Sequence, residues 1–573
     1  MLTTQLEKPC AFSALSYAWG NGPRHTVIFV NGGEFKVSEE LASALRHLRR
    51  YHEGKEVQNI WIDAISINQD DYGEKNAQIP LMKDIYHSAH EVIVWLGEAD
   101  PLLTRDVIDT LERRVQFDDS GEVIYSEHME AFTREQWINF GTDLMKRPWW
   151  WRMWVIQEIA VARQAVVMCG QYTVGWKKVE AAGFWAQITD KPAYLYATEN
   201  GYLPNVRWKR TYRIKLRAGL PMPILELLQN NVSCLVTNER DMIFSLIGLA
   251  TDIEFSPSTE RLPWRRSDPN SKVRLTCDYG RPVQQLYTDF VHVHANTHAS
   301  LNVICLSKHP KKLKRLPSWV PDWTNFSKTC TFLLSPIGYY EPLPPGFADQ
   351  VPVRYIYNAS IGLKPDFYFG GKDKLHVSAI CFDMVERVGI PFKDGHTPGE
   401  IFYLTLLQWM HLALVDFSNE EEPYVAGGSK IDAYRRTITA DQTRYGARRK
   451  EGEGIFDPRL CIDSSGFSPM EQLKCGMSKS FRDDERAVYL RIGLRTFFVT
   501  KKGYFGIGPP DAKEDDRVCI LSGCSVPVLL RRNRGRIAGL AAETWYFVGE
   551  CFVLGIMDGE AVQKGQLEKL VLK

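Results

Sequence analysis

At 573 residues the chain is too long for one hydrophobic core, and at roughly 100–200 residues per domain we expect three or four domains or subdomains. Hydrophobic residues make up 44% and charged residues 24%, which excludes wholesale disorder and fibrous repeats. The 70 Lys and Arg residues balance the 69 Asp and Glu residues. The resulting net charge of +1 argues against a protein that coats nucleic acid.

The sequence predicts neither a secretory signal nor a membrane-spanning helix. No basic stretch precedes an apolar one at the N-terminus, and no apolar run in the chain reaches about 18 residues. The 12 cysteines are scattered from Cys10 to Cys551 without a CxxC pair. We therefore expect a cytoplasmic protein with reduced thiols and no membrane span.

Strand and helix signals alternate through the N-terminal part. Apolar runs predict buried strands at 12–19, 60–64 and 92–96. Between the first two runs, the Asn-Gly-Gly sequence at 31–33 predicts a hairpin turn, and Ser38 predicts the cap of a helix. A polar loop is expected at 66–73, followed by a helix with Pro80 in its first turn. This alternation predicts an α/β fold with a parallel sheet.

The rest of the chain divides into regions of different character. Residues 1–175 form the α/β part, which ends with a helix over 149–163 that Pro148 opens. Residues 176–333 are predicted to be mainly helical, and 334–480 to be a connecting or mixed region in which 418–460 is a charged loop or a partly disordered insertion. Short strands separated by Gly turns predict a small antiparallel β domain at 481–573.

Several motifs then occur in a fixed order. They are ALSYAWG at 14–20, WIDAISINQ at 61–69, VIVWLG at 92–97 and RPWWWRMWVIQE at 147–158, with a helical block around Tyr86 between the second and third. This ordered set resembles the fungal heterokaryon incompatibility (HET) domain, over residues 1–175. RDMIFSLIGL at 240–249, WVPDW at 319–323 and a tail that begins GEC at 549 resemble segments that follow this domain in other members. The resemblance implies a role in fungal self/non-self recognition, where such domains trigger programmed cell death.

The resemblance also suggests a chemistry. HET domains are similar, at a distance, to Toll/interleukin-receptor (TIR) domains, some of which cleave NAD with a glutamate four residues after a tryptophan. Trp154 and Glu158 have this spacing. The analogy implies a TIR-like parallel-sheet domain with Glu158 as the catalytic residue and NAD as a substrate, with no cofactor and no metal. Ser66 stands where relatives usually carry Cys, so a thiol nucleophile is not available there.

The helix that carries Glu158 supports this idea independently. Residues 151, 154, 155, 158 and 162 share one helical face, and only Glu158 among them is not apolar. A carboxylate on an apolar face is costly unless it takes up a proton or finds a partner, and burial would raise its pKa. The structural alternative is a glutamate that reaches solvent or pairs with a distant Arg.

Further polar and aromatic groups follow the predicted strands, at the edge where ligands bind on parallel sheets. Tyr17 and Trp19 end the first strand, Asp63 ends the second, and Asn68 and Gln69 lie in the loop after it. Together with Trp154 they are the candidate substrate-binding residues: Asp63 for ribose hydroxyls, Asn68 and Gln69 for an amide or phosphate, and Trp19 for stacking. The alternatives are a turn or cap for Asp63, an Asx turn for Asn68 and core packing for Trp19.

A second class of function stays open from the sequence. The same domain could be a non-catalytic signalling module that self-associates or binds a partner incompatibility protein, with the Trp-rich helix as an exposed docking surface. A closed pocket that gathers Glu158 with Asp63 and Tyr17 favours the enzyme, whereas an exposed patch at 149–151 favours docking.

Two weaker patterns have a simpler reading. His292, His294 and His298 are spaced like metal ligands, but packing or surface histidines are the expectation because no Cys or carboxylate cluster accompanies them. Cys519 and Cys524 are expected to be core thiols.

Overall fold

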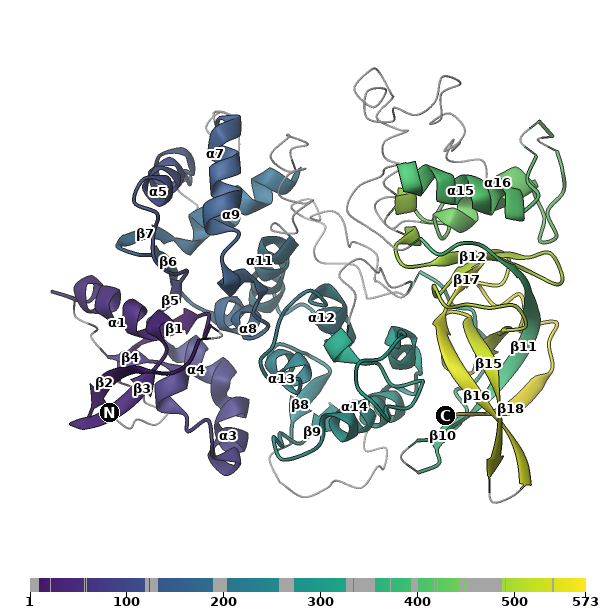
Figure 1. Ribbon diagram of the computed structural model, residues 1–573, viewed down its shortest axis with the longest axis horizontal. Helices are drawn as coiled ribbons and strands as arrows, with labels where there is room; N and C mark the ends of the chain where they lie inside the picture. The colour runs from purple at the N-terminus through teal and green to yellow at the C-terminus, as the bar shows by residue number, and fades with distance from the viewer. Residues whose placement is uncertain are drawn as a thin grey trace. The chain divides into compact units, whose positions relative to one another are not determined.

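The apolar runs of the N-terminal part form adjacent strands of one mostly parallel sheet (Figure 1). In order across the sheet the strands are β4 (Ile60–Trp61), β1 (Ser13–Tyr17), β5 (Glu91–Trp95), β6 (Ala165–Cys169) and β7 (Tyr172–Gly175). The first four are parallel and β7 returns antiparallel to β6. All five residues of β1 and four of the five in β5 are buried, as strands covered on both faces require.

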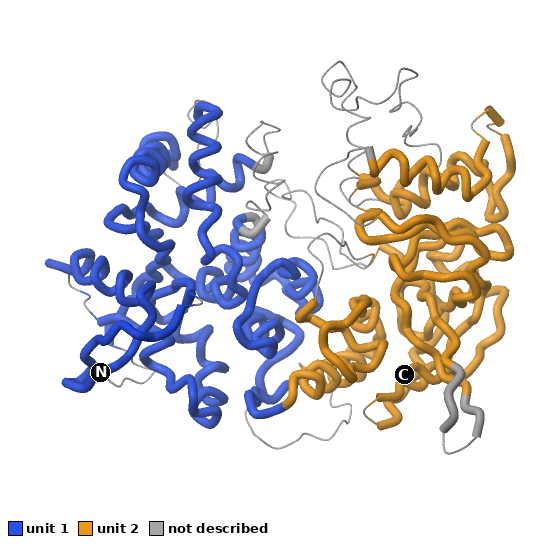
Figure 2. The backbone as a smooth tube through the Cα atoms, viewed as in Figure 1, with its two compact units in different colours: residues 1–261, 274–281 blue, residues 262–273, 282–573 orange. Residues whose placement is uncertain are grey.

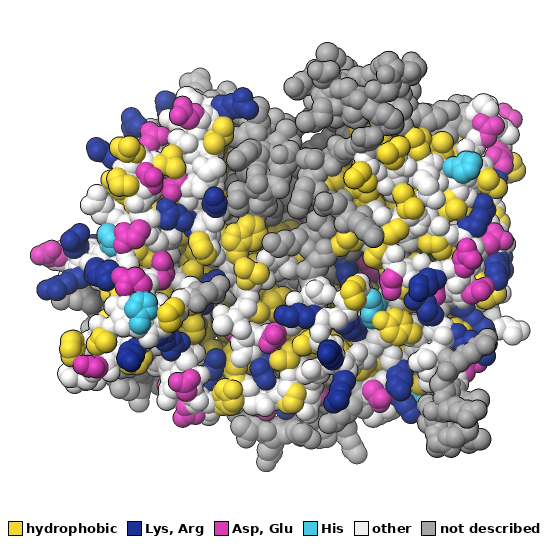
Figure 3. Space-filling view, in the orientation of Figure 1, with side chains coloured by type: hydrophobic (Ala, Val, Ile, Leu, Met, Phe, Trp, Pro, Cys, Tyr) yellow, Lys and Arg dark blue, Asp and Glu magenta, His cyan; other side chains and the backbone are white. Residues whose placement is uncertain are grey.

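This computed structural model describes residues 10–188, 204–256, 273–325, 333, 356–392, 400–449 and 487–573, apart from short gaps within these ranges. The chain forms two compact units, of which unit 1 comprises residues 1–261 and 274–281 and unit 2 comprises residues 262–273 and 282–573 (Figure 2). On the face in Figure 3, acidic and basic side chains are interspersed on each unit. No helix of the described residues is long and apolar enough to cross a membrane.

Local signals explain the first elements. Ser38 caps α1 (Glu39–Tyr51) by accepting a hydrogen bond from the backbone N–H of Leu41 at 3.3 Å, as predicted. The hairpin of β2 (Thr26–Val30) and β3 (Gly33–Val37) turns at Asn31 and Gly32, whose φ angles of 52° and 80° explain the Asn-Gly sequence. The buried face of α1 packs on the sheet through Leu41, Ala44 and Leu48.

Two local predictions were wrong, and each error comes from a short helix that was not predicted, whereas Pro80 lies in the first turn that leads into its helix, as predicted. The strand predicted at 60–64 ends at Trp61, and Asp63 begins the short helix α2 (Asp63–Ser66). The polar loop is shorter than predicted because Asp71 caps α3 (Tyr72–Gln78) through the N–H groups of Gly73 and Glu74. A 3₁₀ turn (Ile79–Leu81) containing Pro80 then separates α3 from α4 (Met82–Ser88).

The helix predicted over 149–163 is also two elements. A 3₁₀ turn (Pro148–Trp151) precedes α8 (Trp154–Val161), and Arg152 between them is extended. Trp151 therefore lies outside the helical face of Glu158. Residues 155–161 of α8 are all buried, and the helix packs on α4 and on β1 of the sheet.

Among the described residues, unit 1 contains six further helices. They are α5 (Leu103–Arg114), α7 (Arg134–Asn139), α9 (Trp176–Ile188), α11 (Pro204–Arg217), α12 (Ile224–Asn230) and α13 (Asp241–Ile247), with a π turn at Phe140–Leu144 and the short strands β8 (Ile253–Phe255) and β9 (Val273–Leu275). Both α11 and α13 pack against α8, so residues from beyond 175 complete the surroundings of Glu158.

Unit 2 begins with α14 (Val283–His298), which Pro282 opens as predicted, and contains a large, mainly antiparallel sheet. Its strands are β10 (Phe367–Phe369), β11 (Leu375–Val388), β12 (Thr496–Thr500), β13 (Phe505–Gly508), β14 (Arg517–Leu521), β15 (Val528–Ile537), β16 (Leu540–Glu550), β17 (Phe552–Val553) and β18 (Leu567–Leu572). The pairings β14-β15-β16-β18-β11 return to β14, which closes a barrel (Figure 1). The predicted C-terminal antiparallel sheet is thus confirmed.

One strand of the barrel comes from the region predicted to be connecting or mixed. The long strand β11 comes from the region 334–480 and pairs with β12, β14 and β18. The short helices η4 (Asn302–Leu306) and η5 (Trp323–Asn325) and the helices α15 (Glu400–Leu412) and α16 (Lys430–Ile438) complete unit 2. Because Ser429 caps α16, the span 418–460 is not a loop throughout; residues 450–486 lie outside the described part.

Candidate active site

Glu158 lies inside unit 1, on the face of α8 that packs against β1. Its side chain is 1% exposed. The Ser16 hydroxyl, in β1, donates a hydrogen bond of 2.5 Å to Glu158 Oε2. The other carboxyl oxygen, Oε1, is buried and has no hydrogen-bond partner among the described residues. The nearby Tyr86 hydroxyl lowers the pKa of this carboxyl group as a hydrogen-bond donor does, although it forms no regular hydrogen bond with Oε1. A buried carboxyl oxygen with so little compensation is costly, and it marks a place where a proton or a ligand would be stabilised.

A buried indole completes this arrangement. Trp149 donates its Nε1–H to Ser16 Oγ at 2.7 Å, so hydrogen bonds run from the indole through the hydroxyl to the carboxylate. The 3₁₀ turn after Pro148 places Trp149 there, 0% exposed. The bond from Trp149 uses an acceptor site on Ser16 Oγ, which leaves the hydroxyl hydrogen for Glu158.

Asp63 is the second buried carboxylate, with 7% of its surface exposed. Trp19 donates its indole N–H to Asp63 Oδ2 at 2.9 Å, and the N–H of Ala64 reaches Oδ1 at 2.7 Å. Gln69 donates its amide to the backbone oxygen of Asp63 at 3.2 Å. Trp19 and Gln69 therefore hold Asp63 in place.

Arg152 is the cation of the site and is half-buried. It donates to the backbone oxygen of Tyr17, and its guanidinium carbon lies 5.6 Å from the centre of the Trp19 ring. Arg24 lies 5.8 Å from the same ring. The extended backbone at Arg152, between the 3₁₀ turn and α8, directs this side chain back toward the end of β1.

Burial shifts the ionisation of both carboxylates. It raises the pKa of Glu158 from 4.5 to about 7, with Asp63 adding to the rise and Arg152 opposing it. Burial also raises the pKa of Asp63, again against the positive charge of Arg152. Tyr17 and Tyr86, which are buried in the same region, have raised pKa values chiefly for the same reason and remain neutral phenols. With a pKa of about 7, the carboxyl group of Glu158 exchanges its proton near neutral pH.

A third buried carboxylate comes from the motif at 240–249. Asp241 begins α13, is 7% exposed, and accepts a hydrogen bond from the Tyr279 hydroxyl. Burial raises its pKa, while hydrogen bonds from Tyr279 and from the indole of Trp154 lower it. Trp154 thus contacts Asp241 instead of sharing a hydrogen bond with Glu158. Arg152 also lowers the pKa of Asp241. This one arginine therefore favours the ionised forms of three carboxyl groups, those of Asp241, Glu158 and Asp63.

A buried lysine lies on the other side of the tryptophans. Lys209, in α11, is 1% exposed and donates to the backbone oxygen of Trp150 at 3.2 Å. Its ammonium lies 5.6 Å from the ring centres of both Trp149 and Trp150. Burial lowers the pKa of Lys209 to about 8, so most of the amino groups are still protonated at neutral pH.

The structure brings most, but not all, of the predicted site residues together. Tyr17, Trp19, Asp63 and Glu158 lie in one electrostatic cluster, with Gln69 beside it. Asn68 is exposed, and its side-chain oxygen accepts the N–H of Asp70 at 3.2 Å, which is the Asx-turn alternative.

The candidate site also contains four residues that were not predicted from the sequence: Ser16, Trp149, Arg152 and Asp241. Each lies inside a quoted motif, which is the only signal that could have selected it.

Two of the three tryptophans that the docking alternative requires on the surface are buried. Trp149 and Trp150 are 0% exposed, and both rings contact Trp176, with centroids 5.8 and 5.6 Å away. The exposed patch at 149–151 that would favour docking is therefore not formed by Trp149 and Trp150, because the 3₁₀ turn directs these two indoles into the core.

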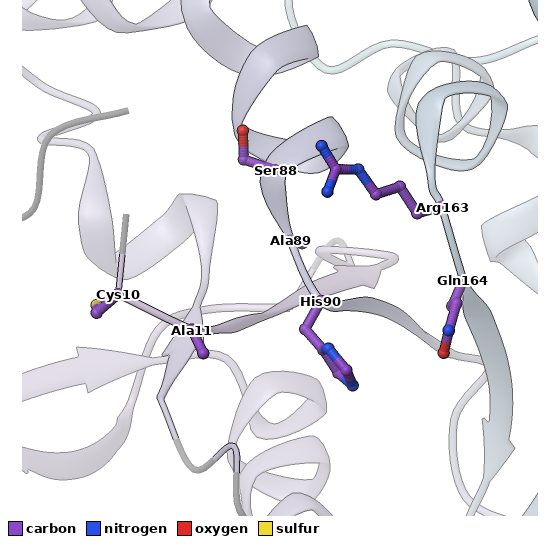
Figure 4. Close-up of a pocket in the computed structure, with 7 residues that line it drawn as sticks. All are labelled: Cys10, Ala11, Ser88, Ala89, His90, Arg163 and Gln164. Carbon is purple, nitrogen blue, oxygen red and sulfur yellow. The ribbon is translucent and has the colours of Figure 1, made fainter. Parts of the chain in front are cut away.

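A separate cavity of about 370 Å³ opens at the other end of the sheet (Figure 4). The residues that line it precede β1, β5 and β6, so it lies at the amino ends of these strands, away from Tyr17 and Asp63. They are Cys10, Ala11, Ser88, Ala89, His90, Arg163 and Gln164.

Comparison with known proteins agrees with the two-part organisation. Residues 12–158 match the family model of the heterokaryon incompatibility protein (HET), and residues 472–572 match the Het-6 beta-barrel domain. Residues 12–158 thus carry the HET domain that the motifs predict. The chain is 25% identical to heterokaryon incompatibility protein 6, OR allele, of Neurospora crassa over 653 residues, which cover 100% of this chain and 92% of the relative. No solved structure matches the chain significantly.

Asp241 and Lys209 lie beyond the end of the HET match at residue 158. The surroundings of Glu158 therefore need α11 and α13 as well as the matched region.

The raised pKa of Glu158 predicts a pH-dependent stability. The folded chain holds this proton up to about pH 7, whereas the unfolded chain releases it near 4.5. Stability is therefore lost as pH rises between these two values, by on the order of 3 kcal/mol. Calorimetry at about pH 5 and about pH 8 should show a smaller decrease in Tm for Glu158→Gln than for the wild type. Equal decreases in both proteins would contradict this ionisation.

Proposed function

We propose that this chain is an effector of fungal self/non-self recognition whose HET domain cleaves NAD and causes programmed cell death. Family membership supports a role in fungal incompatibility. The observation that supports the chemistry is Glu158, a buried carboxyl group with a pKa of about 7 beside Ser16 and close to Asp63 and Arg152. Carboxyl groups with strongly shifted pKa values concentrate at functional sites.

The proposed reaction breaks the bond between the nicotinamide nitrogen and ribose C1′. The bonding electrons leave with nicotinamide, and positive charge develops on C1′ and the ring oxygen. Ionised Glu158 stabilises that charge, and water adds to C1′ with release of a proton. The products are nicotinamide and ADP-ribose. Neither a metal nor a further cofactor enters this scheme.

The other polar groups receive binding roles in this proposal. Asp63 accepts hydrogen bonds from the ribose hydroxyls, and Trp19 stacks on a ring of the substrate. Gln69 and Asn68 donate to an amide or phosphate group, while Tyr17 and Trp154 line the site.

Access to Glu158 requires a movement. The carboxyl group is 1% exposed, whereas Trp19, Arg152 and Trp154 next to it are half-exposed. We propose that these three side chains move aside to admit the substrate. A site that is closed at rest suits an effector that must stay inactive until a partner or self-association triggers it.

The test is direct. Purified full-length protein is incubated with NAD, and the products are separated by liquid chromatography. We expect nicotinamide and ADP-ribose in equal amounts, with turnover rising as pH increases through about 7 because the ionised form of Glu158 is the active one. No product from protein that kills cells on inducible expression in a fungal host would favour the non-catalytic module. Size-exclusion chromatography with light scattering would then test self-association.

A further inference from the structure

Two cysteines face each other across neighbouring strands of the barrel in unit 2. Cys381 in β11 and Cys519 in β14 are direct partners in the antiparallel register. Their sulfur atoms lie 3.3 Å apart. Directly opposed residues of antiparallel strands have Cα separations that a disulfide can span. Bond formation requires the two sulfurs to approach from 3.3 Å to about 2.05 Å, a movement that side-chain rotation can supply.

The thiols lie on the outer face of the barrel wall. Val518 and Ile520 belong to the buried core cluster, and side chains alternate along a strand, so Cys519 and Arg517 share the opposite face. Cys519 is buried under this face and Cys381 is partly exposed. Cys381 is therefore the thiol that a small oxidant in solvent reaches first.

The surroundings favour Cys381 as the reacting thiol. The hydrogen bond that the Cys519 thiol donates and the nearby guanidinium of Arg517 both lower the pKa of Cys381. Burial raises the pKa of Cys519. Arg517 is held on this face by Trp545, whose ring centre lies 4.6 Å from its guanidinium carbon. A thiol beside a fixed cation forms its reactive thiolate more readily.

We propose that Cys381 and Cys519 are an oxidative modification site, which a peroxide converts into a disulfide that joins β11 to β14. The Cys381 thiolate attacks one peroxide oxygen, the O–O bond breaks, and a sulfenic acid and water form. Cys519 sulfur then attacks the Cys381 sulfur, the S–O bond breaks, and a second water leaves. Two thiols and one hydrogen peroxide thus give one disulfide and two waters, with two electrons passing from the sulfurs to the peroxide. This inference is independent of NAD cleavage.

The barrel provides a matched comparison. Cys305 in η4 and Cys524 after β14 have sulfurs 3.9 Å apart, but both residues are 0% exposed. The hydrogen bond with Cys524 and burial both raise the pKa of Cys305, so a thiolate at Cys305 is not favoured. Proximity alone would oxidise both pairs, whereas the proposed mechanism oxidises only the pair with an accessible member.

The experiment uses the full-length protein, treated with hydrogen peroxide, blocked with N-ethylmaleimide and digested for mass spectrometry. We expect a linked peptide pair containing Cys381 and Cys519, while Cys305 and Cys524 become alkylated only after denaturation. Cys381→Ser should abolish the link, and Cys524→Ser should leave it intact. The oxidised wild type should also unfold at a higher temperature than the reduced protein.

Two outcomes would overturn the proposal. One is that Cys381 and Cys519 remain alkylatable thiols after peroxide treatment, and the other is that the Cys305–Cys524 pair links at the same rate. If Cys381→Ser does not fold, labelling rates in the wild type decide the question. Cys381 must then react with N-ethylmaleimide before Cys305 and Cys524 do.

Discussion

Replacement of Glu158 by Gln is expected to reduce NAD cleavage by roughly 100-fold or more, which is the usual effect of removing a catalytic carboxylate or a transition-state charge partner. Glutamine keeps the size of the side chain and an oxygen that accepts the Ser16 hydroxyl, so the contact at 2.5 Å is retained. Only the negative charge is lost. The measurement is kcat and KM with NAD, because loss of transition-state stabilisation lowers kcat while leaving KM nearly unchanged.

The matched control is Glu112→Gln. Glu112, in α5, pairs with Lys178 at 2.6 Å and its side chain is 47% exposed, so its loss should leave turnover unchanged. Equal activity of Glu158→Gln and wild type would remove Glu158 from the mechanism. Equal loss in both variants would indicate general damage to the protein.

The largest effect on stability is expected in unit 2, at the buried ion pair of Arg495 and Glu550. The Arg495 guanidinium lies 2.6 Å from Glu550 Oε1, and the two side chains are 3% and 4% exposed. The N–H of Leu333 also donates to this oxygen at 3.0 Å. Arg495→Met leaves a buried carboxylate without its cation, which should cost about 3–5 kcal/mol. Urea unfolding followed by hydrogen exchange in peptides of β12 and β16 reports on this unit alone.

Two further variants make that experiment specific. Lys569→Met removes a surface pair with Asp366, in which the two side chains are 73% and 54% exposed, and should cost far less stability than Arg495→Met because solvent screens the pair. Adding Glu550→Gln to Arg495→Met should recover part of the lost stability, because the uncompensated charge disappears. A cost for Arg495→Met no larger than that for Lys569→Met would show that the pair is not effectively buried.

Local patterns predicted the parts of the fold whose cause is local. The cap at Ser38, the hairpin turn at Asn31 and Gly32 and the helix after Pro282 each depend on a few adjacent residues. A helical break was missed where two short elements share one periodic pattern, as at Arg152. Periodicity gives the face of a residue but does not locate such breaks.

For the candidate site, the sequence by itself determined that a glutamate stands on an apolar helix within a set of HET motifs. Only the tertiary structure decided which groups surround it. Ser16 is 142 residues from Glu158 in the chain, and Asp241 comes from a helix beyond the matched domain. Closure of the barrel by β11 and β14 is a contact of the same kind. No periodic pattern encodes a pairing over such separations, because it depends on which buried faces meet when the whole chain folds.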